Sequence, residues 1–227
     1  MPSHFDINHL NTLRTFAARV DYCNQNLKML GRGSSRAAYA LPNPVDGSQC
    51  VLKIAVNRKG IAQIAVESDA GWNKYPAVAK IYATSEKHEW VVMELCRRFN
   101  IFEFYNIMKL GSDFPIAPSE FLGVLVQRFL DRVEFKESDD IWTLKLEENI
   151  ELFREEGTND EFITFIDNLD TLIGDARPDE ATIEDLRAMY NWGFATRDGN
   201  EQPVILDYGL NNKVWSSMYY KKPKNVR

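Results

Sequence analysis

The spacing of hydrophobic residues divides the chain into two parts that meet near residue 97. Before that point, short runs rich in β-branched and aromatic residues predict strands over residues 37–41, 50–56, 79–84 and 90–96. Apolar positions three and four residues apart predict helices over residues 1–25 and 61–72. Pro42, Pro44 and the pair Asp46-Gly47 favour a hairpin turn between the first two strands.

After residue 97, apolar residues recur with the period of a helix. One stripe covers residues 121–133, with Pro118 before it and Ser119 as the expected N-cap. Two more helices are expected over residues 141–153 and 162–173, and strands over 194–196 and 204–206 flank a turn at residues 198–200. The pattern therefore predicts an α+β chain with a small β-rich lobe, a larger helical lobe and a late hairpin.

Length and composition limit the class of protein. The chain has 227 residues, of which 44% are hydrophobic and 26% charged, as in soluble globular proteins. No apolar run approaches the roughly 18 residues of a membrane helix, and the first residues lack the layout of a secretion signal. The cysteines, Cys23, Cys50 and Cys96, are odd in number and far apart, which predicts reduced thiols in a cytoplasmic chain. Cys50 and Cys96 adjoin apolar runs and are expected to be buried.

Charge is distributed unevenly along the sequence. Residues 134–185 hold 18 acidic and 4 basic side chains, a local net charge of −14 against −6 for the whole chain. A nucleic-acid partner is not expected, because such proteins usually carry a concentrated basic stripe. The acidic half either attracts a basic protein or keeps the lobe soluble. The basic cluster Lys221, Lys222, Lys224 and Arg227 is expected to be a solvated tail.

Three features of the β-rich part could bind a phosphate. Gly31 and Gly33 allow backbone amides to approach an anion, or they form an ordinary hairpin turn. Lys53 lies inside an apolar strand, so its ammonium either meets a polar partner or points to solvent from an edge strand. Glu67 follows Ile64 by three residues on the predicted helix, where it could pair with Lys53 or be exposed.

A further candidate lies near the end of the chain. Three apolar strand residues lead into Asp207, which is followed by Tyr208 and Gly209. An acid at the end of a buried strand is a suitable oxygen ligand for Mg²⁺. The alternative is a strand that ends in an ordinary turn.

Together these residues resemble the protein kinase-like fold. Lys53 follows Gly31 by 22 residues within Val-Leu-Lys-Ile, which is similar to the Val-Ala-Ile-Lys of the third kinase strand. Glu67 resembles the glutamate of the C-helix, and Asp207-Tyr208-Gly209 resembles Asp-Phe-Gly. Residues 28–39 are similar to the glycine loop of T7-type phage serine/threonine kinases, and a bacteriophage origin is inferred from that similarity alone.

The resemblance also assigns roles around the adenine and the metal. Residues 90–96 resemble the strand that enters the adenine-binding hinge, with Met93 as gatekeeper and Glu94 and Cys96 as cofactor-binding positions. Asn191 resembles the catalytic-loop asparagine, so Asn191 and Asp207 would hold Mg²⁺. Gly31, Gly33, Lys53 and Glu67 would bind ATP, with Lys53 also catalytic.

The sequence departs from the family pattern in several places. Arg36 replaces the third glycine of the loop, where it would contact a phosphate or cap the site. His-Arg-Asp is absent; Asp185, six residues before Asn191, could serve as base through a one-residue bulge, or Thr182-x-x-Asp185 is a helix N-cap box. Asp175 is a second candidate base, and a third possibility is that no base exists. Only 18 residues follow Gly209, too few for the peptide-binding helices of eukaryotic kinases.

These observations lead to an expected architecture and to competing functions. The resemblance implies a two-lobed kinase-like fold with an antiparallel N-lobe sheet, one helix and a minimal helical C-lobe: lead-in 1–26, N-lobe 27–96, C-lobe 97–215 and basic tail 216–227. It implies an ATP- and Mg²⁺-dependent serine/threonine phosphotransferase in the bacterial host cytoplasm. The alternative is a pseudokinase that binds a protein, as a host-factor inhibitor or virion component. Small-molecule phosphotransfer of the aminoglycoside-kinase type is a third class.

Overall fold

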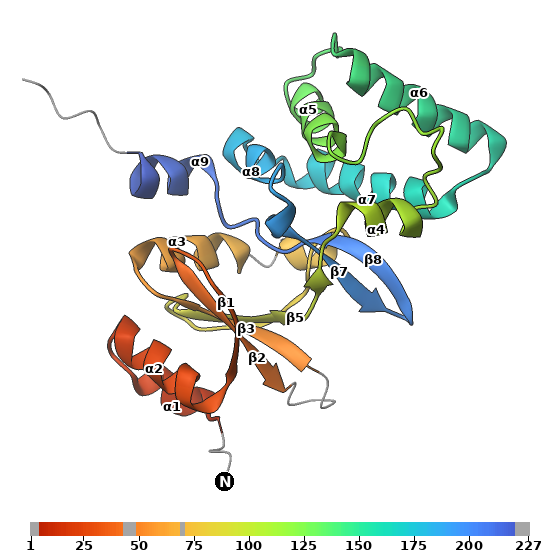
Figure 1. The fold of residues 1–227 in the computed structure, drawn as a ribbon. Coiled ribbons are helices and arrows are strands. Elements are labelled where there is room, and N and C mark those ends of the chain that lie inside the picture. Colours follow the sequence, from red (N-terminus) through yellow and green to blue (C-terminus); the bar gives the residue numbers. More distant parts are fainter. Residues whose placement is uncertain (1–4, 43–48, 69–70, 221–227) are drawn as a thin grey trace, which may run out of the picture. The chain divides into compact units, whose positions relative to one another are not determined.

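The computed structural model describes residues 5–42, 49–68 and 71–220, which form an α+β structure (Figure 1). Contacts divide these residues into two compact units. Among the described residues, the first unit comprises 5–42, 49–68, 80–95 and 209–220, and the second comprises 71–79 and 96–208. Residues 209–220 thus group with the sheet of the first unit. No helix in the described part is both long and apolar enough to cross a membrane.

Within its described residues, the first unit contains a five-stranded antiparallel sheet in the order β1-β2-β3-β5-β4. The strands are β1 (Lys28–Arg32), β2 (Arg36–Pro42), β3 (Gln49–Ala55), β4 (Ile81–Thr84) and β5 (Trp90–Glu94). On the central strand β3, Lys53 lies opposite Ala38 of β2 and Val91 of β5. The edge-strand interpretation of Lys53 is therefore wrong. The turn expected at Pro44 and Asp46-Gly47 lies outside the described residues.

Helices cover the two faces of this sheet. On one face, α1 (Ile7–Thr12) and α2 (Phe16–Asn26) pack Leu10, Val20 and Cys23 against Leu52 and Ile54. On the other face, α3 (Arg58–Glu67) packs Ile64 against Ala55 and Val91. Because side chains alternate along a strand, Lys53 shares the α3 face with Ala55.

Two helices of the first unit differ from their expected lengths. The lead-in is broken at Leu13–Thr15 because the Thr15 side chain accepts a hydrogen bond from the Ala18 amide and starts α2 afresh. Helix α3 starts at an Asn57 cap and ends at Glu67, so residue 72 belongs to the separate short helix η1 (Trp72–Lys74).

The cysteines are reduced thiols, as expected. Cys23 and Cys50 are buried, and burial raises the pKa of the Cys23 thiol to about 12, so that it is protonated at neutral pH. Cys96 is only half-buried, which corrects the expectation of a buried position there.

The second unit combines helices with a small sheet in the order β6-β7-β8. Its helices are α4 (Ile101–Ile107), α5 (Phe121–Val133), α6 (Ile141–Glu156), α7 (Asp160–Ala176) and α8 (Glu180–Asp185), with the turn η2 (Met189–Asn191). Its strands are β6 (Arg97–Arg98), β7 (Trp192–Arg197) and β8 (Asn200–Ile205). Phe104, Phe121, Phe162, Phe165 and Trp192 form a continuous aromatic core between the helices and the hairpin.

Two helix starts in this unit differ from the expected ones. The N-cap residue of helix α5 is Glu120 and not the expected Ser119. The Glu120 side chain makes no capping hydrogen bond. Helix α8 is capped by Asp179, whose carboxylate accepts from the amide and the hydroxyl of Thr182. Since α8 ends at Asp185, the N-cap box proposed for Thr182 and Asp185 is wrong.

In the first unit, the last described elements are α9 (Asn212–Val214) and the π-helical turn η3 (Trp215–Tyr219). The Lys59 ammonium of α3 lies 4.2 Å from the centroid of the Tyr219 ring. This cation–π contact fastens the end of the described chain to α3.

Candidate functional site

The first unit brings Lys53 and Glu67 together. Lys53 Nζ lies 3.5 Å from Glu67 Oε1, and the Glu67 residue is fully buried. The predicted ion pair is therefore confirmed, and Glu67 is not the exposed glutamate of the alternative interpretation. The Lys53 side chain is 15% exposed, so it is not fully shielded from solvent. A buried carboxylate is tolerated in this position because it is paired.

Arg36 is a second partner of the same carboxylate, which sequence reasoning did not assign. Its Nη1 lies 2.6 Å from Glu67 Oε1, shorter than the contact from Lys53. In the register of β2 and β3, Ala38 lies opposite Lys53, and Arg36 is two residues from Ala38 on the same face. This alternation of side chains along a strand was the signal from which the pairing of Arg36 with Glu67 could have been predicted. Arg36 therefore fixes Glu67 from the glycine-loop side of the sheet.

Gly31 and Gly33 lie in the hairpin that joins β1 to β2, as the alternative interpretation of these glycines expected. Neither has a positive φ among the described glycines, although the Gly33 amide donates to the Arg36 carbonyl at 2.8 Å. A Cβ at Gly31 would meet nothing within 4 Å, and one at Gly33 would make an ordinary 3.8 Å contact. No side chain therefore covers the loop at these two glycines, although the Gly33 amide is already bonded to the Arg36 carbonyl.

The loop is attached to the start of α3 by several short contacts. The Ser35 hydroxyl donates to Gln63 Oε1 at 2.6 Å, and Asn57 Nδ2 donates to the Ser34 carbonyl at 2.7 Å. A Cβ on Gly60 would lie 2.1 Å from the Ser35 carbonyl oxygen, so only glycine fits there. These residues couple the position of the loop to that of the helix that carries Glu67.

Gly209 makes a close approach to the same helix. A Cβ at Gly209 would lie 2.6 Å from the Gln63 carbonyl oxygen. The glycine of the Asp-Tyr-Gly segment is therefore required by contact with α3. Asp207 precedes it by two residues, which spans at most about 7 Å of extended chain.

The second unit holds Asn191 in a defined position. Its residue is 1% exposed, and its Nδ2 donates to the Asp185 backbone carbonyl at 2.8 Å. The Leu206 amide donates to the Asn191 carbonyl at 2.7 Å, and the Trp192 indole donates to the Leu186 carbonyl at 2.8 Å. These bonds tie η2 to the end of α8 and to the residue before Asp207.

The side-chain oxygen of Asn191 is suited to a metal ion. Asn191 Oδ1 is buried and has no hydrogen-bond partner within the described part of the chain. A buried amide oxygen without a partner carries a desolvation cost that a cation would relieve. Asp207 is half-buried, two residues beyond β8. No group of three His, Cys, Asp or Glu side chains among the described residues forms a metal site by itself.

The remaining predicted residues occupy varied surroundings. Asp185 is half-buried at the end of α8, and Asp175 lies in the exposed last turn of α7, where its charge interacts with Lys74.

The residues expected near the adenine lie on and after β5. Glu94 is buried, and its Oε2 accepts from the Lys80 amide at 3.0 Å. A Cβ on Gly193 would lie 2.9 Å from the Cβ of Cys96. Met93 is buried in β5.

Comparison of the sequence with protein-family models gives no match, and comparison with curated proteins gives none either. The function is therefore argued from the residues of this chain. Arg36, Lys53 and Glu67 belong to the first unit, and Asp185, Asn191 and Asp207 to the second. The convergence of Lys53 and Asp207 on one triphosphate stays a prediction.

Proposed function

We propose that the protein binds ATP with Mg²⁺ in a kinase-like site and transfers the terminal phosphoryl group to a protein serine or threonine. The observation that carries the proposal is the Lys53–Glu67 ion pair on the α3 face of the sheet. A lysine held by a buried glutamate, on the sheet that also carries the loop with Gly31 and Gly33, has the chemistry needed to position phosphates. The predicted phage origin and cytoplasmic location belong to the same proposal.

Each residue has a separate task in this mechanism. The Lys53 ammonium and the amides around Gly31 and Gly33 orient the phosphate chain, while Glu67 holds Lys53. Asn191 Oδ1 and the Asp207 carboxylate would hold Mg²⁺, which when bound neutralises phosphate charge. The Asp185 carboxylate would accept the proton of the attacking hydroxyl. Glu94 and Cys96 would border the adenine.

One observation favours a second candidate, a pseudokinase that binds nucleotide without transfer. Glu67 is closer to Arg36, at 2.6 Å, than to Lys53, at 3.5 Å. An arginine that takes the stronger hydrogen bond leaves Lys53 less firmly oriented for catalysis. Such a protein would use its fold as a binding surface.

A thermal-shift experiment with ATP and Mg²⁺ tests nucleotide binding. A ligand that binds only the native state stabilises it by about 2.7 kcal/mol at a hundredfold excess over Kd. We expect this shift in the wild type and in the control Lys28→Met, which removes an exposed lysine of β1. Lys53→Met should abolish the shift without changing the circular dichroism spectrum. The absence of a shift in the wild type, or an equal shift in Lys53→Met, would reject the nucleotide site.

The same proteins separate an enzyme from a pseudokinase. Incubation with ATP labelled in the γ-phosphate should transfer label to the protein itself or to bacterial lysate proteins. Asp185→Asn should remove transfer but keep the thermal shift, whereas Asp175→Asn should keep both. A nucleotide-induced shift without transfer in the wild type would leave the pseudokinase as the function.

A further inference from the structure

Helix α6 has one packed face and one exposed face. Thr143, Leu146 and Ile150 are buried on the side that packs against α5 and α7 (Figure 1). The opposite side carries large apolar residues that remain in solvent: Ile141 is 57% exposed, Leu144 42% and Leu152 46%. An amphipathic helix normally buries its large apolar residues. These three side chains are instead left exposed in the described structure.

The exposed apolar residues belong to one continuous row. Ile141, Leu144, Glu148, Leu152 and Glu155 follow one another at spacings of three or four residues, which places them along one side of the helix. We call these five residues the outer row of α6. The row extends over about 21 Å, because an α-helix rises 1.5 Å per residue.

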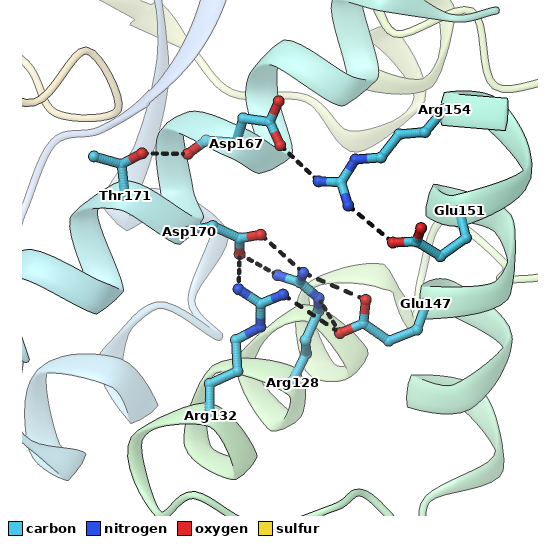
Figure 2. Close-up of polar contacts among 8 residues, drawn as sticks. All are labelled: Arg128, Arg132, Glu147, Glu151, Arg154, Asp167, Asp170 and Thr171. Carbon is cyan, nitrogen blue, oxygen red and sulfur yellow. Dashed lines mark hydrogen bonds and ion pairs between the residues drawn. The ribbon is translucent and has the colours of Figure 1, made fainter. Parts of the chain in front are cut away.

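The acidic residues of this region fall into two groups, which the charge pattern alone did not separate. Figure 2 shows that Glu147 pairs with Arg128 and Arg132, and that Arg154 joins Glu151 to Asp167. These carboxylates are already paired with arginines of α5 and α6. Their negative charge is therefore partly neutralised before any partner binds.

The second group faces solvent. Glu148, Glu155 and Glu156 are exposed and form no ion pair with any residue that the structure describes. Two of them stand within the outer row, between and beyond its leucines, and the third adjoins it. The outer row thus combines apolar contact area with carboxylates that form no ion pair in the described structure, while Lys145 beside the row lies over the Trp142 ring.

We propose that the outer row of α6 is a docking site for a basic amphipathic helix of a partner protein. The apolar side chains supply area that becomes buried on binding, and the carboxylates pair with lysine or arginine at the margins of the partner helix. Nucleic acids and anionic lipid surfaces carry the same sign of charge as this row and are repelled by it. The inference goes beyond the proposed function and does not rest on it, because no residue of the outer row belongs to the proposed nucleotide site.

Two designed peptides provide the probe. Each is a fluorescein-labelled helix of about 18 residues with a leucine row, flanked by lysines in one peptide and by glutamates in its twin. Fluorescence anisotropy should show that the lysine peptide binds the wild type at least about tenfold more tightly than the twin does, with affinity that falls as salt is added.

Variants locate the binding on α6. The triple change Glu148→Gln, Glu155→Gln and Glu156→Gln should weaken the lysine peptide by about tenfold or more. The double change Leu144→Ser and Leu152→Ser should weaken binding of the lysine peptide by a similar factor. The charge-matched control Glu86→Gln, Glu180→Gln and Asp198→Asn removes three exposed acids elsewhere and should change affinity less than about twofold. Circular dichroism confirms that each variant is folded.

Several results would overturn the inference. Equal binding of the two peptides, or binding that survives both α6 variants, would show that the outer row is not the site. Sedimentation that reveals a dimer lost in the leucine variant would assign the row to a second copy of the chain. The Lys53→Met variant should bind the lysine peptide with wild-type affinity. The peptide experiment therefore tests the outer row separately from the nucleotide site, and either proposal can fail without the other.

Discussion

At the scale of single residues, Arg128 is a charged side chain that is buried within the helical unit. It is 1% exposed, and its guanidinium donates to both Glu147 and Asp170 (Figure 2). Burial by itself would lower the pKa of Arg128, but hydrogen bonds and charges from Asp170 and Glu147 raise it overall. The arginine therefore stays charged and links α5 to both α6 and α7.

Arg128→Ala should lower the free energy of unfolding by about 1–3 kcal/mol, because it empties a buried position and removes the Arg128 hydrogen bonds to Glu147 and Asp170, which keep only Arg132 as partner in the described structure. Arg154→Ala is the matched control. Arg154 also joins two acids, but its side chain is 36% exposed, so its removal should cost less than about 1 kcal/mol. Urea denaturation monitored by tryptophan fluorescence measures both values. Equal losses would show that burial is not what makes the Arg128 network important.

At the scale of elements, the contact between the glycine loop and α3 determines where Glu67 lies. Gly60 allows the first turn of α3 to approach Ser35, whose hydroxyl also bonds to Gln63. The site therefore depends on helix position as well as on the charged residues themselves.

Gly60→Ala should destabilise the protein by about 1–3 kcal/mol, because the added methyl would overlap the Ser35 carbonyl. Helix propensity alone predicts the opposite sign. Gly174→Ala in α7 is the control, since its Cβ would meet nothing within 4 Å, and it should stabilise by about 0.5–1 kcal/mol. Thermal unfolding of both variants tests the contrast. Stabilisation by Gly60→Ala would contradict the close contact.

At the scale of the whole molecule, the proposed function requires both compact units to contribute to one ligand. Lys53 and the glycine loop come from the first unit, and Asn191 and Asp207 from the second. The Gly209 contact with α3 shows that the chain after Asp207 returns to the first unit.

Hydrogen exchange in the presence of ATP tests this requirement. We expect ATP with Mg²⁺ to protect amides of residues 31–36 and also of residues 207–209, because ligand contacts reduce local opening. Replacing Mg²⁺ by EDTA should remove the second protection first, since that segment would hold the metal. Protection confined to one unit under both conditions would reject a shared site.

The candidate site was predictable only where its signals are local. Lys53 is conspicuous because an ammonium interrupts an apolar strand, and Glu67 because it lies close to the apolar face of one short helix. The pairing of Arg36 with Glu67 depends on strand register across two neighbouring strands. The expected helix start at Ser119 was wrong because α5 begins after Glu120 without a side-chain cap, and the start at Thr182 was wrong because Asp179, three residues earlier, caps α8.

The sequence by itself determined the strand and helix periodicities, the α+β class and the acidic character of the helical region, because each of these is a property of neighbouring residues. Only the tertiary structure decided which acids are paired with arginines. Glu147 and Glu148 are adjacent, yet one faces Arg128 and the other faces solvent. A helix turns by about 100° per residue, so the orientation of α6 against α5 and α7 assigns each glutamate its surroundings.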